Sequence, residues 1–253
     1  MKILAMALNT FREAVRDRVL YLILVFAVLL IAASALLSML TVGSEEKIIK
    51  DFSLSMISLF GTAAALFIGI GLVYKEIEKR TVYTLLSKPI RRGEFLAGKY
   101  LGLCMTLAVN LAVMSAAFYT LLALRGFSAE GMWMALLLIY VELMLVTAIA
   151  LFFSSFSTPI LSGLFAGTLW VVGHLTWSLK LLEELVTGAL ARGVIRFFYL
   201  VLPDLEKLNV RGDLVYGVAI SPERFAFALI YGLSYTALVL LAASAVFQRR
   251  DFL

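Results

Sequence analysis

The sequence predicts an all-α integral membrane protein with six transmembrane helices. Of its 253 residues, 62% are apolar and 15% are charged, whereas soluble domains have about 45–50% apolar and about 25% charged residues. The mean hydropathy is +1.00, and long apolar runs follow one another with short polar connections. Little room remains for a soluble domain, so we expect one transmembrane domain over residues 1–253.

Six apolar runs are each long enough to cross a bilayer as a helix. About 20 apolar residues, rising about 1.5 Å each, span the hydrocarbon core. The first run is too long for the apolar part of a secretory signal, so we expect it to be retained as a helix. The runs cover residues 19–40, 52–73, 100–124, 132–153, 159–179 and 225–247.

Lysine and arginine are distributed unevenly between the two sides that these spans define. Cytoplasmic connections of membrane proteins are enriched in both residues, whereas long loops cross the membrane largely regardless of charge. The short connections on one side hold only Lys47, Lys50 and Arg125. The other side holds Lys2, Arg12, Arg16, Arg18, seven residues between the second and third spans, Arg249 and Arg250. We therefore expect both termini to be cytoplasmic, in a multi-pass protein of the cytoplasmic (inner) membrane.

The net charge of +5 does not indicate nucleic-acid binding. The cations gather at the ends of the spans rather than along one exposed face, and membrane orientation already accounts for their excess. One cysteine, Cys104, and one histidine, His174, exclude a disulfide framework. For the same reason we expect no metal site built from this chain's cysteine and histidine side chains.

An amphipathic helix is predicted ahead of the first span, within residues 1–18. Apolar side chains recur there at helical spacing, and the opposite face is polar. We expect this helix to lie in the cytoplasmic interface, although an ordinary extension of the first span remains the alternative. The apolar face holds Leu4, Leu8, Phe11 and Val15, and the polar face holds Lys2, Asn9, Glu13 and Arg16.

The cytoplasmic segment 74–99 contains a second short helix. Proline disfavours helix at the preceding residue, so a helix beginning near Glu76 should end near Leu86, before Ser87-Lys88-Pro89. The stretch from Gly93 to Tyr100 approaches the pattern of a phosphate-binding loop, but Tyr100 replaces the Ser or Thr that would hold magnesium. Because no strand precedes it either, we expect this chain not to bind ATP itself.

Two ionisable residues fall inside predicted spans and form the candidate intramembrane polar site. Glu142 and His174 must each find a partner or face a wet cavity, because an uncompensated polar group at membrane depth costs a few kcal/mol. A structural hydrogen bond and a role in a transport pathway are both open for Glu142. For His174, bonding between helices is the simpler interpretation.

The outer segment 180–224 is too long for a plain turn and carries apolar stretches. We expect short helices that lie on the outer interface and cap the exit of the membrane domain. Arg192 and Arg196 lie one helical turn apart, a spacing that suits contact with lipid phosphate.

The order of these features resembles the permease subunits of type-2 ABC exporters over the whole chain. The segment after the second span reads KEIEKRTVYTLLSKPIRRGEFLAGKYLG. The family pattern there has acidic residues, a Thr, a Leu-Leu-Ser or Leu-Leu-Ala run, a Pro, a basic residue and a Gly-Lys. The matching positions are Glu76, Glu78, Thr81, Leu85, Leu86, Ser87, Pro89, Arg91, Arg92, Gly98 and Lys99.

The resemblance implies that the helix after the second span is a coupling helix, seated on a dimer of separate cytoplasmic ABC ATPase subunits that bind ATP and Mg. It further implies a second permease copy, export of a hydrophobic or amphipathic substrate, contact with membrane lipid, and room for extracytoplasmic accessory subunits. The chain itself would be a transport subunit with no catalytic residues and no cofactor. The implied contact residues are Glu76, Glu78, Lys79, Arg80 and Thr81, with Tyr83, Leu85 and Leu86 as an apolar anchor.

Two other classes of protein remain as alternatives. An ABC-type membrane scaffold that transmits mechanical work to extracytoplasmic partners would share the coupling helix. An ion-coupled secondary transporter would need inverted repeats and ionisable groups gathered at mid-membrane. The sequence shows no clear repeat and only Glu142 and His174 as candidates.

Overall fold

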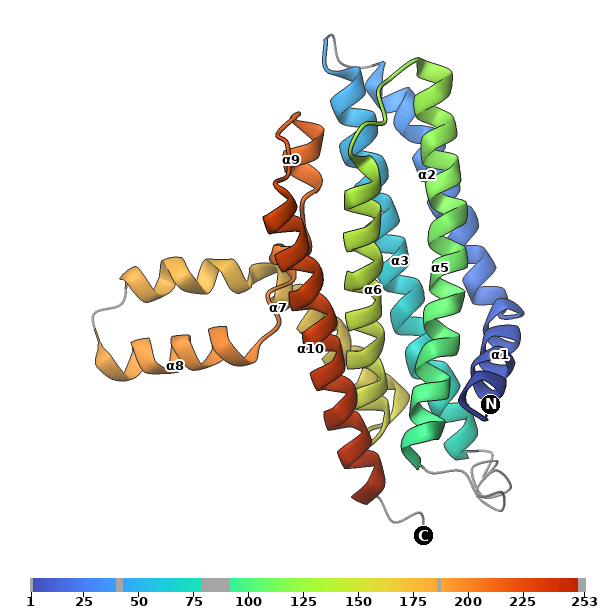
Figure 1. The fold of residues 1–253 in the computed structure, drawn as a ribbon, viewed down its shortest axis with the longest axis vertical. Helices are drawn as coiled ribbons and strands as arrows, with labels where there is room; N and C mark the ends of the chain where they lie inside the picture. The colour runs from blue at the N-terminus through green and yellow to red at the C-terminus, as the bar shows by residue number, and fades with distance from the viewer. Residues whose placement is uncertain (1, 40–42, 79–91, 186–187, 250–253) are drawn as a thin grey trace.

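The chain folds into a bundle of long helices with a helical hairpin that extends from its side (Figure 1). The computed structural model describes residues 2–39, 43–78, 92–185 and 188–249. In chain order the elements are α1 Lys2–Val15, α2 Arg18–Ser38, α3 Glu45–Glu78, α5 Arg92–Arg125, α6 Met132–Ser154, α7 Pro159–Leu185, α8 Ala189–Val201, the 3-10 helix η1 Leu205–Leu208, α9 Arg211–Val215 and α10 Pro222–Arg249.

The predicted fold class is confirmed. Six helices of the described chain, namely α2, α3, α5, α6, α7 and α10, are long and apolar enough to cross a membrane. Each contains most of the apolar run predicted from the sequence. The helices satisfy their own backbone hydrogen bonds, which hydrocarbon demands of any spanning segment.

Helix α6 lies at the centre of the bundle. It packs against α3, α5, α7 and α10, and 72% of its apolar stretch is buried, against 17% for α10. A helix that is apolar on every side suits this position, because it has no face to present to water. Helix α6 therefore sets the positions of the helices around it.

Tyrosine hydroxyls join α5 to α6 at two levels. Tyr140 donates to the carbonyl oxygen of Cys104 at 3.1 Å, and Tyr100 donates to the carbonyl oxygen of Met144 at 3.3 Å. In each pair the hydroxyl finds an acceptor that is already part of a helix, so a buried polar group is satisfied without a break in either helix.

Helix α1 packs along the first half of α5 through small residues. Ala7, Thr10 and Ala14 are buried there, and a Cβ atom on Gly102 would lie 2.5 Å from the carbonyl oxygen of Ala7. Small residues allow such close approach between helices. Lys99 of α5 reaches across to Glu13 at 3.8 Å.

The face of α1 that packs on α5 differs from both faces predicted from the sequence. The apolar side chains of Leu4 and Leu8 stay exposed, and the contact uses small residues between the apolar and polar faces. Hydrophobic periodicity identified the helix but not its packing face, because a close contact in a membrane selects for small size rather than hydrophobicity.

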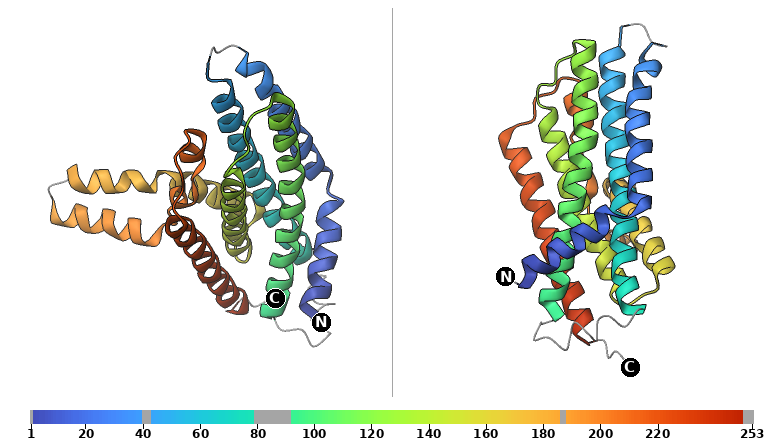
Figure 2. Two further views of the ribbon diagram at one scale, coloured as in Figure 1. Left: turned by 45° about the horizontal axis from the view of Figure 1, so that its top comes forward. Right: turned by 90° about the vertical axis from the view of Figure 1, so that its right-hand side faces the viewer.

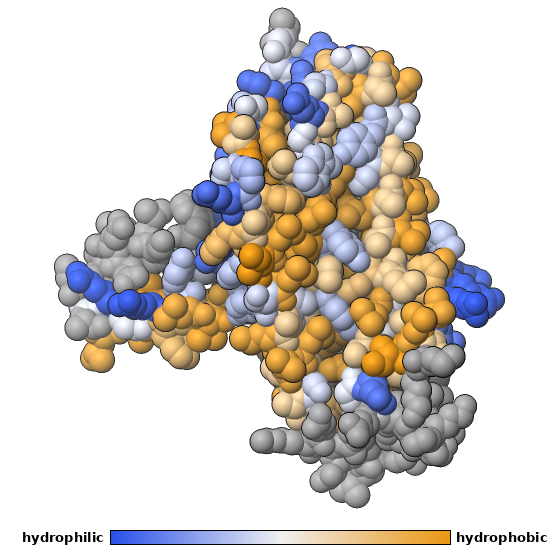
Figure 3. All heavy atoms as spheres, viewed as in Figure 1, coloured by the Kyte–Doolittle hydropathy of each residue, from blue (hydrophilic) through white to orange (hydrophobic). Residues whose placement is uncertain are grey.

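The sequence after α7 forms a hairpin and then returns into the bundle. The end of α7 and α8 extend away from the helices (Figures 1 and 2), and α8 carries exposed apolar side chains such as Leu190 and Leu200. Apolar atoms gather along one edge of this projection, with hydrophilic atoms above them (Figure 3).

The returning segment 202–210 is buried, unlike the hairpin before it. Leu205 and Leu208 of η1 are fully enclosed between α6, α7 and α10. Gly173 and Gly232 make room for them, since a Cβ atom at Gly173 would lie 2.8 Å from Leu205 Cδ1 and one at Gly232 would lie 3.1 Å from Leu208 Cδ2. The backbone of this segment is held by Thr176, which donates to the Pro203 carbonyl at 3.3 Å, and by the Tyr231 hydroxyl, which accepts from Asp204 N at 2.8 Å.

The close approach of α1 and α5 predicts that Gly102→Ala is destabilising. The added methyl group meets the backbone of α1, and overpacking of this kind costs about 1–3 kcal/mol. Thermal unfolding of the purified protein in detergent measures the effect. Gly71→Ala is the matched control, because a Cβ atom there meets nothing within 4 Å, and equal unfolding temperatures for the two variants would contradict the packing described.

Candidate functional site

Glu142 lies near the middle of α6, and its side chain is only 3% exposed. An ionisable group in this position needs partners, because a bare charge inside a protein is strongly disfavoured. The partners come from two of the helices that pack against α6, namely α3 and α7. The structure thus brings together Glu142 and His174, the two residues of the intramembrane polar site predicted from the sequence.

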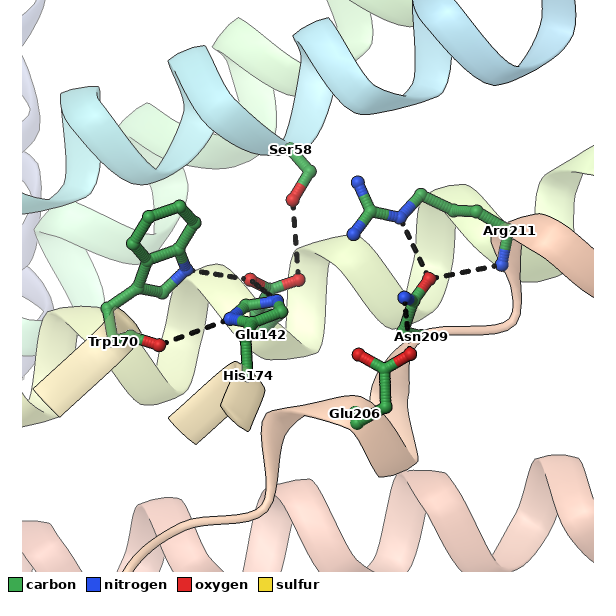
Figure 4. A network of polar contacts seen from close by, with 7 residues as sticks. All are labelled: Ser58, Glu142, Trp170, His174, Glu206, Asn209 and Arg211. Atoms are coloured by element: carbon green, nitrogen blue, oxygen red, sulfur yellow. Dashed lines mark hydrogen bonds and ion pairs between the residues drawn. The ribbon is translucent and has the colours of Figure 1, made fainter. Parts of the chain in front are cut away.

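Three side chains contact the carboxyl group of Glu142 (Figure 4). Trp170 Nε1 donates to Oε1 at 3.0 Å, and the Ser58 hydroxyl donates to Oε2 at 3.5 Å. His174 Nε2 lies 3.5 Å from Oε1. Trp170 and His174 are four residues apart on α7, so one face of that helix presents both side chains to α6.

The hydrogen-bond partners of His174 determine where its protons lie. Nδ1 is 3.1 Å from the carbonyl oxygen of Trp170, which can only accept, so Nδ1 carries a proton. Nε2 faces the carboxyl group of Glu142, 3.5 Å from Oε1, so the ring lies between a backbone carbonyl and a buried carboxyl group.

A cavity of about 430 Å³ borders this cluster between α3, α7 and the start of α9. Its polar lining residues are Ser55, Ser58, Trp170, His174 and Arg211, and its apolar lining residues are Met56, Leu59, Val171 and Leu175. Glu142 lies behind the lining and contacts it through the three side chains above. A volume of this size is within the range of small-molecule sites, which is about 300–1,000 Å³.

Arg211 is a residue of this site that the sequence reasoning did not select. Asn209 Oδ1 accepts from both the backbone N, at 3.3 Å, and Nε, at 2.9 Å, of Arg211. Asn209 is held in turn by Glu206, whose Oε1 accepts from Asn209 Nδ2 at 2.9 Å. The local signal was an Asn two residues before the Arg, which favours a side-chain turn, but nothing local showed that this turn lies beside α3 and α7.

The predicted coupling residues fall mostly outside the described residues. Glu76 and Glu78 belong to the last turn of α3, which continues without a break from the second span. Their side chains are not described. The other members of the set, namely Lys79, Arg80, Thr81, Tyr83, Leu85 and Leu86, lie in the segment 79–91 that the description leaves out.

The stretch that approaches a phosphate-binding loop is helical. Gly93 to Tyr100 lies within α5, whereas a phosphate-binding loop needs an open turn whose backbone N–H groups face the phosphates. Lys99 in this stretch lies beside Glu13 of α1. Residues 93–100 therefore do not form an open phosphate-binding turn in this structure.

A bundle of six helices that are long and apolar enough to cross a membrane is the architecture of a multi-pass membrane protein. Residues 4–252 match the family described as ABC-2 family transporter protein, and the chain belongs to this family. It is a permease, the membrane component of an ABC transporter, and such permeases generally work with an ATP-binding subunit. No curated protein matches the chain.

The contacts of Glu142 predict different outcomes for two substitutions. Glu142→Gln keeps an oxygen acceptor for Trp170, whereas Glu142→Leu leaves buried donors without a partner, which costs about 1–3 kcal/mol. Glu142→Gln should therefore unfold at a higher temperature than Glu142→Leu in a thermal-stability assay of the detergent-purified protein.

The same two substitutions at the exposed residue Glu130 provide the matched control and should not differ from each other. If both Glu142 variants fold normally and lose transport equally, the carboxylate has a charge-dependent role in transport instead.

Proposed function

We propose that this chain is the permease of an ABC exporter that moves an amphipathic substrate outward across the cytoplasmic membrane. Energy comes from ATP and Mg bound by a dimer of separate ATPase subunits. The observation that carries this proposal is the family match over residues 4–252, together with a bundle whose cavity is lined by both polar and apolar side chains. The permease works as a pair of copies, and extracytoplasmic accessory subunits are compatible with the proposal.

The arrangement of the helices supports cytoplasmic termini. The end of α3, the start of α5 and the end of α10 lie at the same end of the bundle, with α1 beside the first half of α5 (Figure 1). Arg92 and Arg249 lie at this end, and the segment 79–91 between α3 and α5 adds further basic residues. By the positive-inside rule this end is cytoplasmic.

Force is transmitted through two helices that leave the membrane on this side. Helix α3 runs unbroken from Glu45 into Glu78, and α5 begins at Arg92 and carries α1 on its first half. Movement of the segment between them displaces α3 at one end and α5 with α1 at the other. Rigid helices of this kind convert movement at a cytoplasmic contact into rearrangement of the membrane domain.

The Glu142 and His174 pair favours one alternative, an ion-coupled transporter. A carboxyl group beside an imidazole inside the membrane resembles the relays of proton-driven carriers. In that case transport would follow a proton gradient across sealed vesicles and would not require ATP. Under the proposed function ATP drives transport, and the pair is a structural and binding element.

Purification from the native membrane in mild detergent tests the proposal directly. The tagged chain should bring down a soluble protein with a nucleotide-binding loop, and the complex should hydrolyse ATP. Recovery of the chain without any ATPase, together with proton-driven transport in vesicles, would overturn the proposed function.

Substitutions in the cytoplasmic segment test the coupling contact. Tyr83→Ala and Glu78→Arg should leave the membrane domain folded while weakening ATPase binding by about tenfold or more, because anchor residues at interfaces contribute about 2 kcal/mol each. Transport should be lost in parallel.

The matched controls for the coupling contact are Tyr21→Ala in α2 and Glu45→Arg at the opposite end of α3. Both should retain the ATPase and transport. Full transport by Tyr83→Ala and Glu78→Arg would show that this segment does not hold the coupling helix.

A further inference from the structure

The lining of the cavity beside Glu142 includes Arg211, whose guanidinium group has hydrogen-bond donors that are not used by the described residues. Arg211 uses Nε on Asn209, and neither of its terminal amino groups has an acceptor among the residues that the structure describes. Figure 4 shows this guanidinium group directed toward the space beside Ser58 and Glu142. The Ser55 hydroxyl, also in the lining, has no partner within the described ranges either.

The other polar side chains of the lining, Ser58, Trp170 and His174, already contact Glu142 behind it. Ser58 and Trp170 donate to Glu142, and His174 is held between Glu142 and the Trp170 carbonyl. Any polar ligand in the cavity therefore meets Arg211 first. The fork of donors on a guanidinium group matches the paired oxygens of phosphate, sulfate or carboxylate.

The charge of the lining also favours an anion. Arg211 carries a permanent positive charge, and Glu142 lies behind the lining, where its carboxyl group accepts from Ser58 and Trp170. The acidic residues nearest in sequence are engaged elsewhere: Asp204 is 3.5 Å from Lys207, and Asp213 is 2.6 Å from Arg224. Glu206 is not among the lining residues and accepts from Asn209.

The rim of the cavity is apolar and open. Leu59, Val171 and Leu175 line it and are 45%, 49% and 56% exposed. A ligand whose charged end reaches Arg211 must therefore place its other end against these side chains, where burial of apolar surface is favourable. A small inorganic anion would leave this rim without contacts.

We propose that the cavity binds the anionic head of an amphipathic substrate, with Arg211 as the ligand of the head and the side chains of Leu59, Val171 and Leu175 against the tail. This inference rests on the proposed function, because it names the class of substrate that the permease moves. The head is a phosphate, sulfate or carboxylate, on a membrane lipid or on a soluble single-chain amphiphile.

Photo-crosslinking on the purified complex in a neutral maltoside detergent tests the proposal. The probe is dodecyl phosphate with a diazirine in its chain, and the twin probe carries a trimethylammonium head on the same chain. The phosphate probe should label peptides of α3 and α7 around residues 55–59 and 170–175, and the twin should not. Equal labelling of the unsubstituted protein by the two probes would overturn the proposal.

Arginine variants then test the assigned ligand. Arg211→Gln should raise the half-saturating concentration of the phosphate probe by about tenfold or more, because the charge-assisted hydrogen bonds to the head are lost. Arg211→Lys keeps the charge and should lose less. Arg12→Gln, the same change at an exposed arginine of α1 outside the cavity, should leave the value unchanged, and an unchanged value in Arg211→Gln would overturn the assignment.

Competitors identify the source of the head. Displacement by phosphatidylglycerol assigns a membrane lipid, whereas resistance to it assigns a soluble amphiphile, and both results support the shared chemistry. Displacement by inorganic phosphate alone at similar concentrations would overturn the amphipathic assignment. If labelling occurs as expected in a preparation that lacks an ATPase, the proposed function fails and the binding site stands. If an active ATPase complex is not labelled, the proposed function stands and the binding site fails.

Discussion

A carboxyl group inside a membrane bundle must be hydrogen bonded and neutralised, and the arrangement around Glu142 follows from this constraint. Glu142 belongs to the most buried helix of the bundle, so its partners must come from neighbouring helices. Ser58 of α3 and the Trp170 and His174 pair of α7 meet it there. The polar cluster joins α3 and α7 to the buried helix α6, and separating these three helices would expose unpaired polar groups to hydrocarbon.

The returning segment after α8 depends on this core and completes the site. Leu205 and Leu208 fill the space between α6, α7 and α10, where Gly173 and Gly232 provide clearance. Once these leucines are buried, the chain emerges beside the polar cluster, and the Asn209 turn directs Arg211 into the cavity. An apolar anchor thus places a cation near a buried acid without bonding the two, which leaves the cation available to a ligand.

At the end of the bundle that holds α1, the helices are held together by close packing instead. Small residues on α1 and glycines on α5 bring two helices into contact that have little hydrophobic reason to associate within a membrane. Helix α5 and α1 therefore form one unit next to the segment that joins α3 to α5. Under the proposed function this unit and α3 receive the movement of the ATPase dimer, while the polar cluster lies on the far part of α3. The continuity of α3 between the two regions is the simplest physical link between them.

The sequence alone determined the class, the six spans and the presence of two polar residues at membrane depth. Apolar runs of this length have only one stable form in a bilayer, so Glu142 and His174 could be selected without a structure. The packing face of α1 and the role of Arg211 could not be predicted in the same way. Both depend on contacts between segments far apart in the chain: Ala7 with Gly102, and the Asn209 turn with α3 and α7. Periodicity and hydropathy describe one helix at a time, whereas the cavity exists only where α3, α7 and the start of α9 meet.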